Sequence, residues 1–177
     1  MHQQPGSSKP RRNRRLSLLS LIALATLAIG VWPSAADHGL PHPEPLVRGT
    51  FTDDVGATIQ LKQDGRQTQI LKLRDASDIQ IVKITLEPGA HAPWHDHSGP
   101  AFLVNQGPGT FTSIHANDCV PREYGPGEAL VDPGQGNAHA GRNDSDQDVV
   151  IFAVFLGVET TPVLPITEPV EGCEFPL

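Results

Sequence analysis

The sequence predicts an all-β fold, a sandwich or small barrel built as one domain. The chain of 177 residues contains 17 Gly and 17 Pro, well above the usual share of turn-forming residues. Short apolar runs recur along it between Gly- and Pro-containing turns, and no segment carries the caps expected of a helix. A hydrophobic fraction of 38% can supply a folded core, which excludes a wholly disordered chain.

Two of the apolar runs predict where their strands lie. In residues 79–86 apolar side chains alternate with mixed ones, which predicts a strand with one apolar face. Residues 149–156 are apolar on both faces, which predicts a central strand. The expected strands are residues 57–61, 69–73, 79–86, 102–105, 110–115, 128–131 and 149–156.

Residues 1–36 have the pattern of an export signal. Five basic residues precede the apolar run 16–32, no acidic residue occurs, and small residues surround a cleavage position after Ala36. The protein is therefore expected to be exported, to the periplasm or the extracellular space. An uncleaved, membrane-anchored form stays open, because the apolar run reaches only the short end of a membrane span. Contact with a membrane is expected only through this segment.

The charge of the chain excludes one class of partner. Removal of residues 1–36 changes the net charge from −7 to −12, because only basic residues are lost. Such an acidic surface repels phosphate backbones, so nucleic acid is not an expected partner. Composition divides the chain into the signal 1–36, a flexible leader 37–45, the β-domain 46–157 and a Pro-rich tail 158–177.

The two cysteines form no CxxC pattern. In an oxidising compartment Cys119 and Cys173 can pair, which would tether the tail to the domain. Two unpaired thiols are the alternative.

Three histidines are the main clue to function. His95 and His97 are separated by one residue, so in an extended segment both imidazoles point to the same side and can reach one cation. His139 follows a Gly- and Pro-rich turn that can direct the next strand back towards this pair. His115 ends another apolar run and is expected to be an exposed residue at a strand end.

These segments resemble the two motifs of the cupin superfamily. The first motif places His-x-His between glycines and is matched by Gly89, His95, His97 and Gly107. The second is matched, with one extra residue inside it, by Gly127, Pro133, Gly136, His139 and Asn143. The resemblance implies a cupin-type jelly roll, or small β-barrel, with a pocket able to hold a metal, and often a homodimer.

One departure from the family pattern affects the expected ligands. Ala101 occupies the position of the Glu that completes the metal site in such proteins, and alanine offers no donor atom. His95, His97 and His139 remain as three nitrogen ligands, a set that suits zinc, iron, copper or nickel. His91 shares the parity of His95 and is an auxiliary candidate, with a rim or loop position as the alternative.

The sequence therefore predicts an exported single-domain cupin that binds a divalent metal through three histidines, with no assignable reaction. Two alternatives stay open. One is a metal-dependent enzyme, such as a three-His dioxygenase or an isomerase acting on a small polar substrate. The other is a metal-free cupin that binds a small molecule or has a structural role. No catalytic residue is assigned beyond the ligands, and a small-molecule ligand or substrate is left open for each function.

Overall fold

The computed structural model describes residues 39–63, 65–158, 164–165 and 170–175. The export segment predicted for residues 1–36 lies outside these residues, as does much of the tail. In the described part all regular structure is β-strand, in agreement with the predicted fold class. Within the same residues no helix has the length and apolar character needed to span a membrane.

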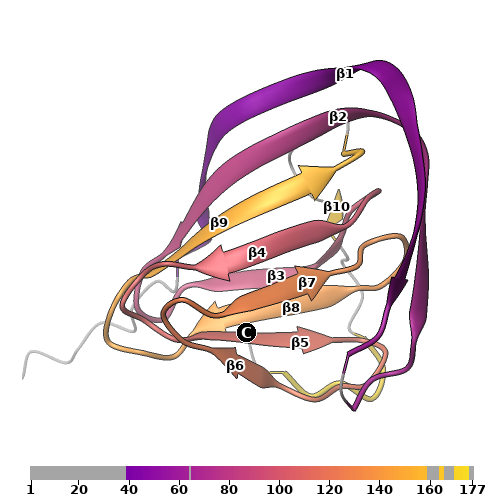
Figure 1. Cartoon of the computed structure of the whole chain (residues 1–177). Helices are drawn as coiled ribbons and strands as arrows, with labels where there is room; N and C mark the ends of the chain where they lie inside the picture. Colours follow the sequence, from indigo (N-terminus) through magenta and orange to yellow (C-terminus); the bar gives the residue numbers. More distant parts are fainter. Residues whose placement is uncertain (1–38, 64, 159–163, 166–169, 176–177) are drawn as a thin grey trace, which may run out of the picture. The chain divides into compact units, whose positions relative to one another are not determined.

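Within the described ranges, ten strands form two antiparallel sheets (Figure 1). One sheet has the order β1-β2-β9-β4-β7 and the other has the order β10-β3-β8-β5-β6. Non-consecutive neighbours in both sheets show that the chain crosses repeatedly between them, as in a jelly roll. The strands are β1 (His42–Leu61), β2 (Gln69–Leu86), β3 (His91–Asp96), β4 (Ala101–Asn105), β5 (Phe111–His115), β6 (Arg122–Tyr124), β7 (Ala129–Asp132), β8 (His139–Asn143), β9 (Val149–Leu156) and β10 (Leu164–Pro165).

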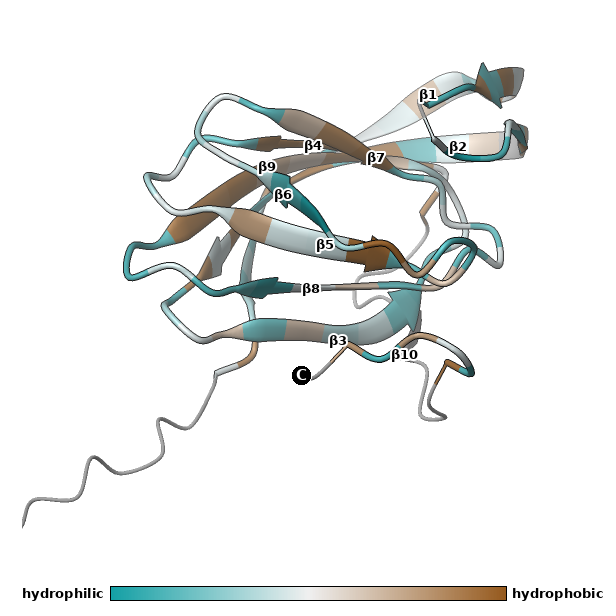
Figure 2. Ribbon diagram, turned by 90° about the horizontal axis from the view of Figure 1, so that it is seen from below, coloured by the Kyte–Doolittle hydropathy of each residue, from teal (hydrophilic) through white to brown (hydrophobic). Residues whose placement is uncertain are grey.

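The main hydrophobic core lies between the sheets. Strand β9 pairs with both β2 and β4, which confirms the prediction that this segment is a central strand. Its inward residues are Val149, Ile151, Ala153 and Phe155, each at most 6% exposed. Figure 2 shows the two stacked layers, with hydrophobic residues concentrated along β4 and β9. Alternation along these strands therefore directs one face of the sheet into the core.

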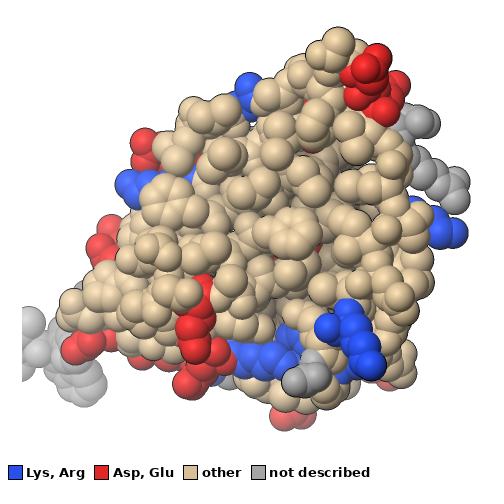
Figure 3. Space-filling model, in the orientation of Figure 1, with Lys and Arg blue, Asp and Glu red and all other residues tan. Residues whose placement is uncertain are grey.

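The outer face of the same sheet is also poor in charge. Phe102 on β4 and Phe152 on β9 are each 37% exposed there. In Figure 3, which views the molecule from this side, Lys, Arg, Asp and Glu lie mainly at the margins. The homodimer implied by the family resemblance stays a prediction.

Strand β1 begins earlier than the sequence analysis expected. It starts at His42, inside the predicted leader 37–45, because residues 42–45 pair with Val82–Thr85 of β2. The first half of β1 thus extends the sheet by backbone hydrogen bonding. Residues 42–48 are all exposed, so they show no alternation that predicts a strand, and an edge strand tolerates Pro43 and Pro45.

A disulfide joins Cys119 to Cys173, as predicted. It fastens the described end of the tail to the outer face of the second sheet. Around it lies a second cluster of buried side chains: Trp94, Ile114, Ala138, Ala140, Cys173 and Phe175. The tail therefore covers apolar residues that would otherwise face water.

Candidate metal centre

The three predicted histidines come together on the inner face of the second sheet. His95 on β3 is the register partner of His139 on β8, and His97 directly follows β3. The ring centroids of His95 and His139 are 4.2 Å apart, and those of His97 and His139 are 4.9 Å apart. His95 and His97 lie 6.3 Å apart. The sequence spacing therefore identified a real cluster.

Each of these imidazoles is held by a backbone carbonyl two residues away. Nδ1 of His95 lies 2.7 Å from the carbonyl oxygen of Pro93, and Nδ1 of His139 lies 2.9 Å from that of Asn137. Nδ1 of His97 contacts the carbonyl oxygen of Gly99 in the same way. A carbonyl only accepts, so Nδ1 must donate and Nε2 is left with its lone pair free. This arrangement fixes the ring orientation and tautomer of metal-binding histidines in general.

A fourth donor, Asp132, was missed by the sequence analysis. It ends β7, is 5% exposed, and places Oδ2 3.6 Å from Nε2 of His139. His97, Asp132 and His139 each offer one ligand atom within 4.8 Å of the others. Together these three buried residues could hold a metal ion.

The register explains why Asp132 is there. Ala101, which stands at the family's Glu position, pairs directly with Asp132 across β4 and β7. Paired residues in antiparallel strands project to the same face. The carboxylate absent from β4 is thus supplied from the neighbouring strand, a relationship that only the register reveals.

His115 is also part of this interior, which corrects its predicted position at the surface. It is 0% exposed, because its pairing with His139 turns its side chain inwards. Its Nε2 lies 3.1 Å from Oδ1 of Asp132. His115 therefore contacts the carboxylate that neighbours the three histidines.

His91 lies on the opposite face of the sheet, so it is not an auxiliary member of the cluster. A bulge between Ala92 and His95 shifts the register, and His91 pairs with Arg142. Arg142 faces outwards, with its guanidinium carbon 4.5 Å from the ring centre of Phe175. Alternation alone would place His91 and His95 on the same face of the strand, but the bulge places them on opposite faces.

The electrostatic environment favours the metal-binding protonation states. Burial lowers the pKa of His95 to about 4, and the nearby His139 imidazole adds to this effect. Burial also lowers the pKa of His97. Burial raises the pKa of Asp132, but His139 and His115 together lower it by more than burial raises it. The pKa of Asp132 is therefore below its usual range. At neutral pH these groups are therefore two neutral imidazoles and a carboxylate, the forms that bind metals.

Two atoms of the cluster have unmet bonding capacity. Nε2 of His139 and Oδ1 of Asp132 are buried, and among the described residues neither makes a well-aligned hydrogen bond. Buried polar atoms are rarely left so, because desolvation is costly without a partner. A cation beside these two atoms would satisfy both, so the residues present fit a metal.

The turn before β8 is built against His97. The backbone N–H of Gln135 donates to the carbonyl oxygen of His97 at 2.8 Å. Gly134 has φ +62°, and a Cβ there would lie 2.5 Å from both Nδ1 and the carbonyl oxygen of His97. Only glycine fits this close approach, which is the physical reason for a glycine in this turn.

Residues 82–155 match the family described as Cupin domain. This segment contains both histidine motifs and six of the ten strands in full. Residues 82–155 are a cupin domain. None of the curated protein sequences compared with the chain matches it.

The cupin domain also has similar solved structures. A cupin-like protein from Thermotoga maritima is 21% identical over 50% of this chain and 64% of its own, with a TM-score of 0.44. A putative sugar phosphate isomerase from Acidithiobacillus ferrooxidans is 22% identical over 44% of this chain and 49% of its own, with a TM-score of 0.38. The polyketide cyclase RemF from Streptomyces resistomycificus is 21% identical over 51% and 62%, with a TM-score of 0.44. The match spans less than two thirds of each of these structures.

Proposed function

We propose that the cupin domain binds a divalent transition metal ion through His95, His97, His139 and Asp132. The observation that carries the proposal is the common orientation of the three imidazoles, each with Nδ1 directed at a carbonyl oxygen. This leaves three Nε2 atoms as donors, and Asp132 adds an anionic oxygen within 4.8 Å of ligand atoms of His97 and His139. Three nitrogen donors and one oxygen donor suit zinc, iron, copper, nickel and manganese.

The chain's own residues would have distinct roles at this site. The carbonyl groups of Pro93, Gly99 and Asn137 hold the imidazoles in place. Asp132 supplies negative charge against the cation in an interior where an unpaired charge is unfavourable. A bound metal would act as a Lewis acid towards an oxygen atom of a small-molecule ligand.

Metal analysis of the purified protein tests this proposal. After loading with zinc and removal of free ion, we expect about one zinc per chain, and loss of tight binding in His97→Ala. His91→Ala is the matched control, since His91 lies on β3 but faces away from His95. Wild-type protein that retains no zinc would overturn the proposal. Equal zinc affinity in His97→Ala and His91→Ala would also overturn it.

We further propose that the protein is exported and works in an oxidising compartment. The basic and apolar pattern of residues 1–36 supports this, and so does the disulfide, because such bonds persist outside the cytoplasm. The mass of the protein isolated from its native cells tests the proposal. Export with cleavage predicts a chain that begins at Asp37, and full-length chain recovered from the cytoplasm would contradict it.

A further inference from the structure

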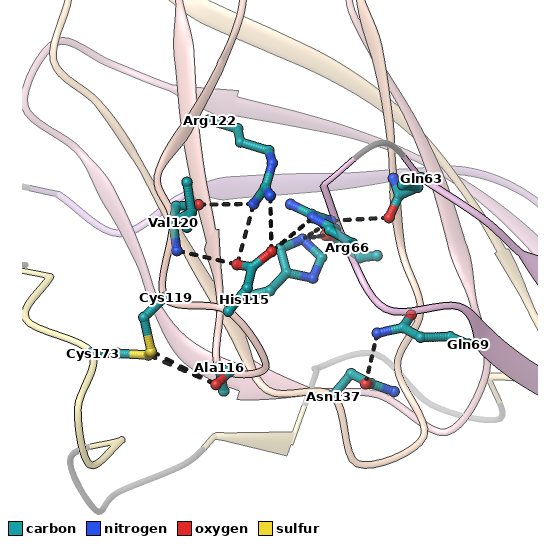
Figure 4. Close-up of polar contacts among 12 residues, drawn as sticks. Gln63, Arg66, Gln69, His115, Ala116, Cys119, Val120, Arg122, Asn137 and Cys173 are labelled. Atoms are coloured by element: carbon teal, nitrogen blue, oxygen red, sulfur yellow. Dashed lines mark hydrogen bonds and ion pairs between the residues drawn. A yellow bond between two sulfur atoms is a disulfide. The ribbon is translucent and has the colours of Figure 1, made fainter.

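Arg66 is a buried cation beside the proposed metal centre. It lies in the turn between β1 and β2, and its side chain is only 3% exposed. Nη1 donates to Oε1 of Gln63 at 3.1 Å, and Nε lies 3.3 Å from Oδ2 of Asp118. Figure 4 shows the guanidinium between Gln63 and His115. The turn thus places a permanent positive charge in the interior.

One imidazole separates this guanidinium from a proposed metal ligand. Nη1 of Arg66 is 3.4 Å from Nε2 of His115. Nε2 of His115 is in turn 3.1 Å from Oδ1 of Asp132. Nε2 of His115 can donate to Asp132 or accept from Arg66, but it cannot do both. A single side chain, His115, therefore lies between Arg66 and the proposed ligand Asp132.

One hydrogen-bond donor of Arg66 lacks an acceptor in the described part of the chain. Its Nη2 is buried and has no hydrogen-bond partner among the described residues. A guanidinium stays charged at any physiological pH, so its buried N–H groups need acceptors. A hydrogen-bond acceptor on a bound molecule would satisfy Nη2 of Arg66.

The charges of the cluster point to an anion as that molecule. Arg66 and Arg122 share a single carboxylate, Asp118, whose Oδ2 lies 2.9 Å from Nη2 of Arg122. Among the described residues, the shared Asp118 therefore neutralises Arg66 only in part, and a divalent cation at the metal centre would exceed the single negative charge of Asp132. Positive charge is then in excess, most of it buried.

We infer that Arg66 recognises a carboxylate group on a small-molecule ligand of the metal centre. A planar carboxylate matches the planar fork of a guanidinium, and its single negative charge opposes part of the excess. The inference rests on the proposed metal site, and it names the ligand class of that site.

Cobalt-loaded protein titrated with sodium acetate tests the inference. Cobalt replaces zinc as a coloured probe, so acetate binding is followed by visible absorption, and cobalt content is measured for each variant. Arg66→Gln should keep its cobalt and bind acetate at least about tenfold more weakly, because a charge-assisted hydrogen bond is lost. Arg122→Gln is the matched control. This substitution removes the other cation that contacts Asp118, and the Arg122 side chain is 24% exposed. The Arg122→Gln variant should bind acetate nearly as well as the wild type.

The outcomes separate this inference from the metal proposal. Wild-type protein without cobalt would overturn the metal proposal and this inference with it. Normal cobalt content together with unchanged acetate affinity in Arg66→Gln would overturn this inference alone. Inorganic phosphate that binds the wild type more tightly than acetate would overturn the assignment to carboxylates.

A second measurement covers the case in which Arg66→Gln does not fold. In the cobalt-free, zinc-loaded wild type, the side-chain Nε–H signal of Arg66 should shift in ¹H–¹⁵N spectra as acetate is added. The conservative variant Arg66→Lys identifies the signal by its disappearance. An Arg66 signal that does not move at saturating acetate would overturn the inference.

Discussion

Ala101 and Asp132 are direct partners across β4 and β7, and both side chains face the interior. Cβ atoms of such partners lie about 4.5–5.5 Å apart, close enough for one position to substitute for the other in space. The cupin domain therefore lacks a carboxylate at the expected position in its sequence but has one beside it in its fold. The three-histidine set predicted from the motifs thereby gains Asp132 as a fourth proposed ligand.

The turn at Gly134 gives a test of how tightly the second motif is built against the first. Gly134→Ala should destabilise the protein, since its Cβ would lie 2.5 Å from Nδ1 of His97 at a φ of +62°. Gly136→Ala is the control, because Gly136 has φ +90° but nothing within 4 Å of its Cβ position. Both substitutions should incur backbone strain of about 1–2 kcal/mol.

Only Gly134→Ala should add a packing penalty, of about 1–3 kcal/mol. It should also weaken zinc binding, because His97 must move. Urea denaturation of metal-free protein measures the first effect, and zinc titration measures the second. Identical behaviour of the two variants would show that the contact with His97 does not constrain the turn.

The disulfide should contribute substantially to stability. Cys119 and Cys173 are 54 residues apart, and closing a loop of this length stabilises a fold by roughly 4 kcal/mol in the chain-entropy model. The double variant Cys119→Ala/Cys173→Ala should lower the free energy of unfolding by about this amount. Wild-type protein with its disulfide reduced is the control, and it should lose a similar amount. A double variant as stable as the oxidised wild type would contradict the prediction.

Asp78 should make the stability of the β1–β2 pair depend on pH. A hydrogen bond from Arg48, at 2.7 Å, is the main reason that the pKa of Asp78 lies below its usual value, and Thr50 adds a second bond at 3.0 Å. A carboxyl group with a lowered folded-state pKa stabilises the protein above its unfolded pKa of about 4. This contribution is lost as the pH falls through the folded pKa.

Asp78→Asn should therefore be less stable than the wild type at pH 7, and the difference should shrink towards pH 3. Asp54→Asn, at an exposed position on β1, is the control and should show no such trend. Urea midpoints across this pH range measure the effect. A constant difference between Asp78→Asn and the wild type at every pH would rule out the ionic contribution.

The sequence predicts the parts of the site that depend on local spacing. His95 and His97 lie two residues apart, and His139 follows a turn rich in glycine, so their convergence can be inferred without coordinates. Asp132 is different, because its role depends on which residue it faces across two strands. Asp132-Pro133-Gly134 does directly follow the predicted strand 128–131 and precede His139, and this is the signal in the sequence that could have drawn attention to Asp132.

Long-range pairing also explains the remaining differences. His115 resembles a strand-end residue in sequence, but its register with His139 turns it inwards. The bulge that turns His91 outwards cannot be read from alternation, which predicted the opposite face. Arg66 lies 49 residues from His115 along the chain, and only the folded β1–β2 turn brings the two together. Local pattern thus predicted the fold class and the histidines, whereas the register determines the charged residues around them.

Zinc affinity of Asp132→Asn is the most direct test of the central claim, that a carboxylate on β7 completes the metal site. Asparagine keeps the size of the side chain but removes its charge, so the zinc affinity should fall. Loss of a residue that only supports the ligands typically costs ~10–100-fold in metal affinity, and loss of a ligand should cost at least as much. Asp96→Asn is the matched control, because Asp96 accepts a hydrogen bond from Gly136 and is not one of the proposed ligands. The prediction is a large loss of affinity for Asp132→Asn and none for Asp96→Asn. Equal zinc affinity in Asp132→Asn and Asp96→Asn would contradict it.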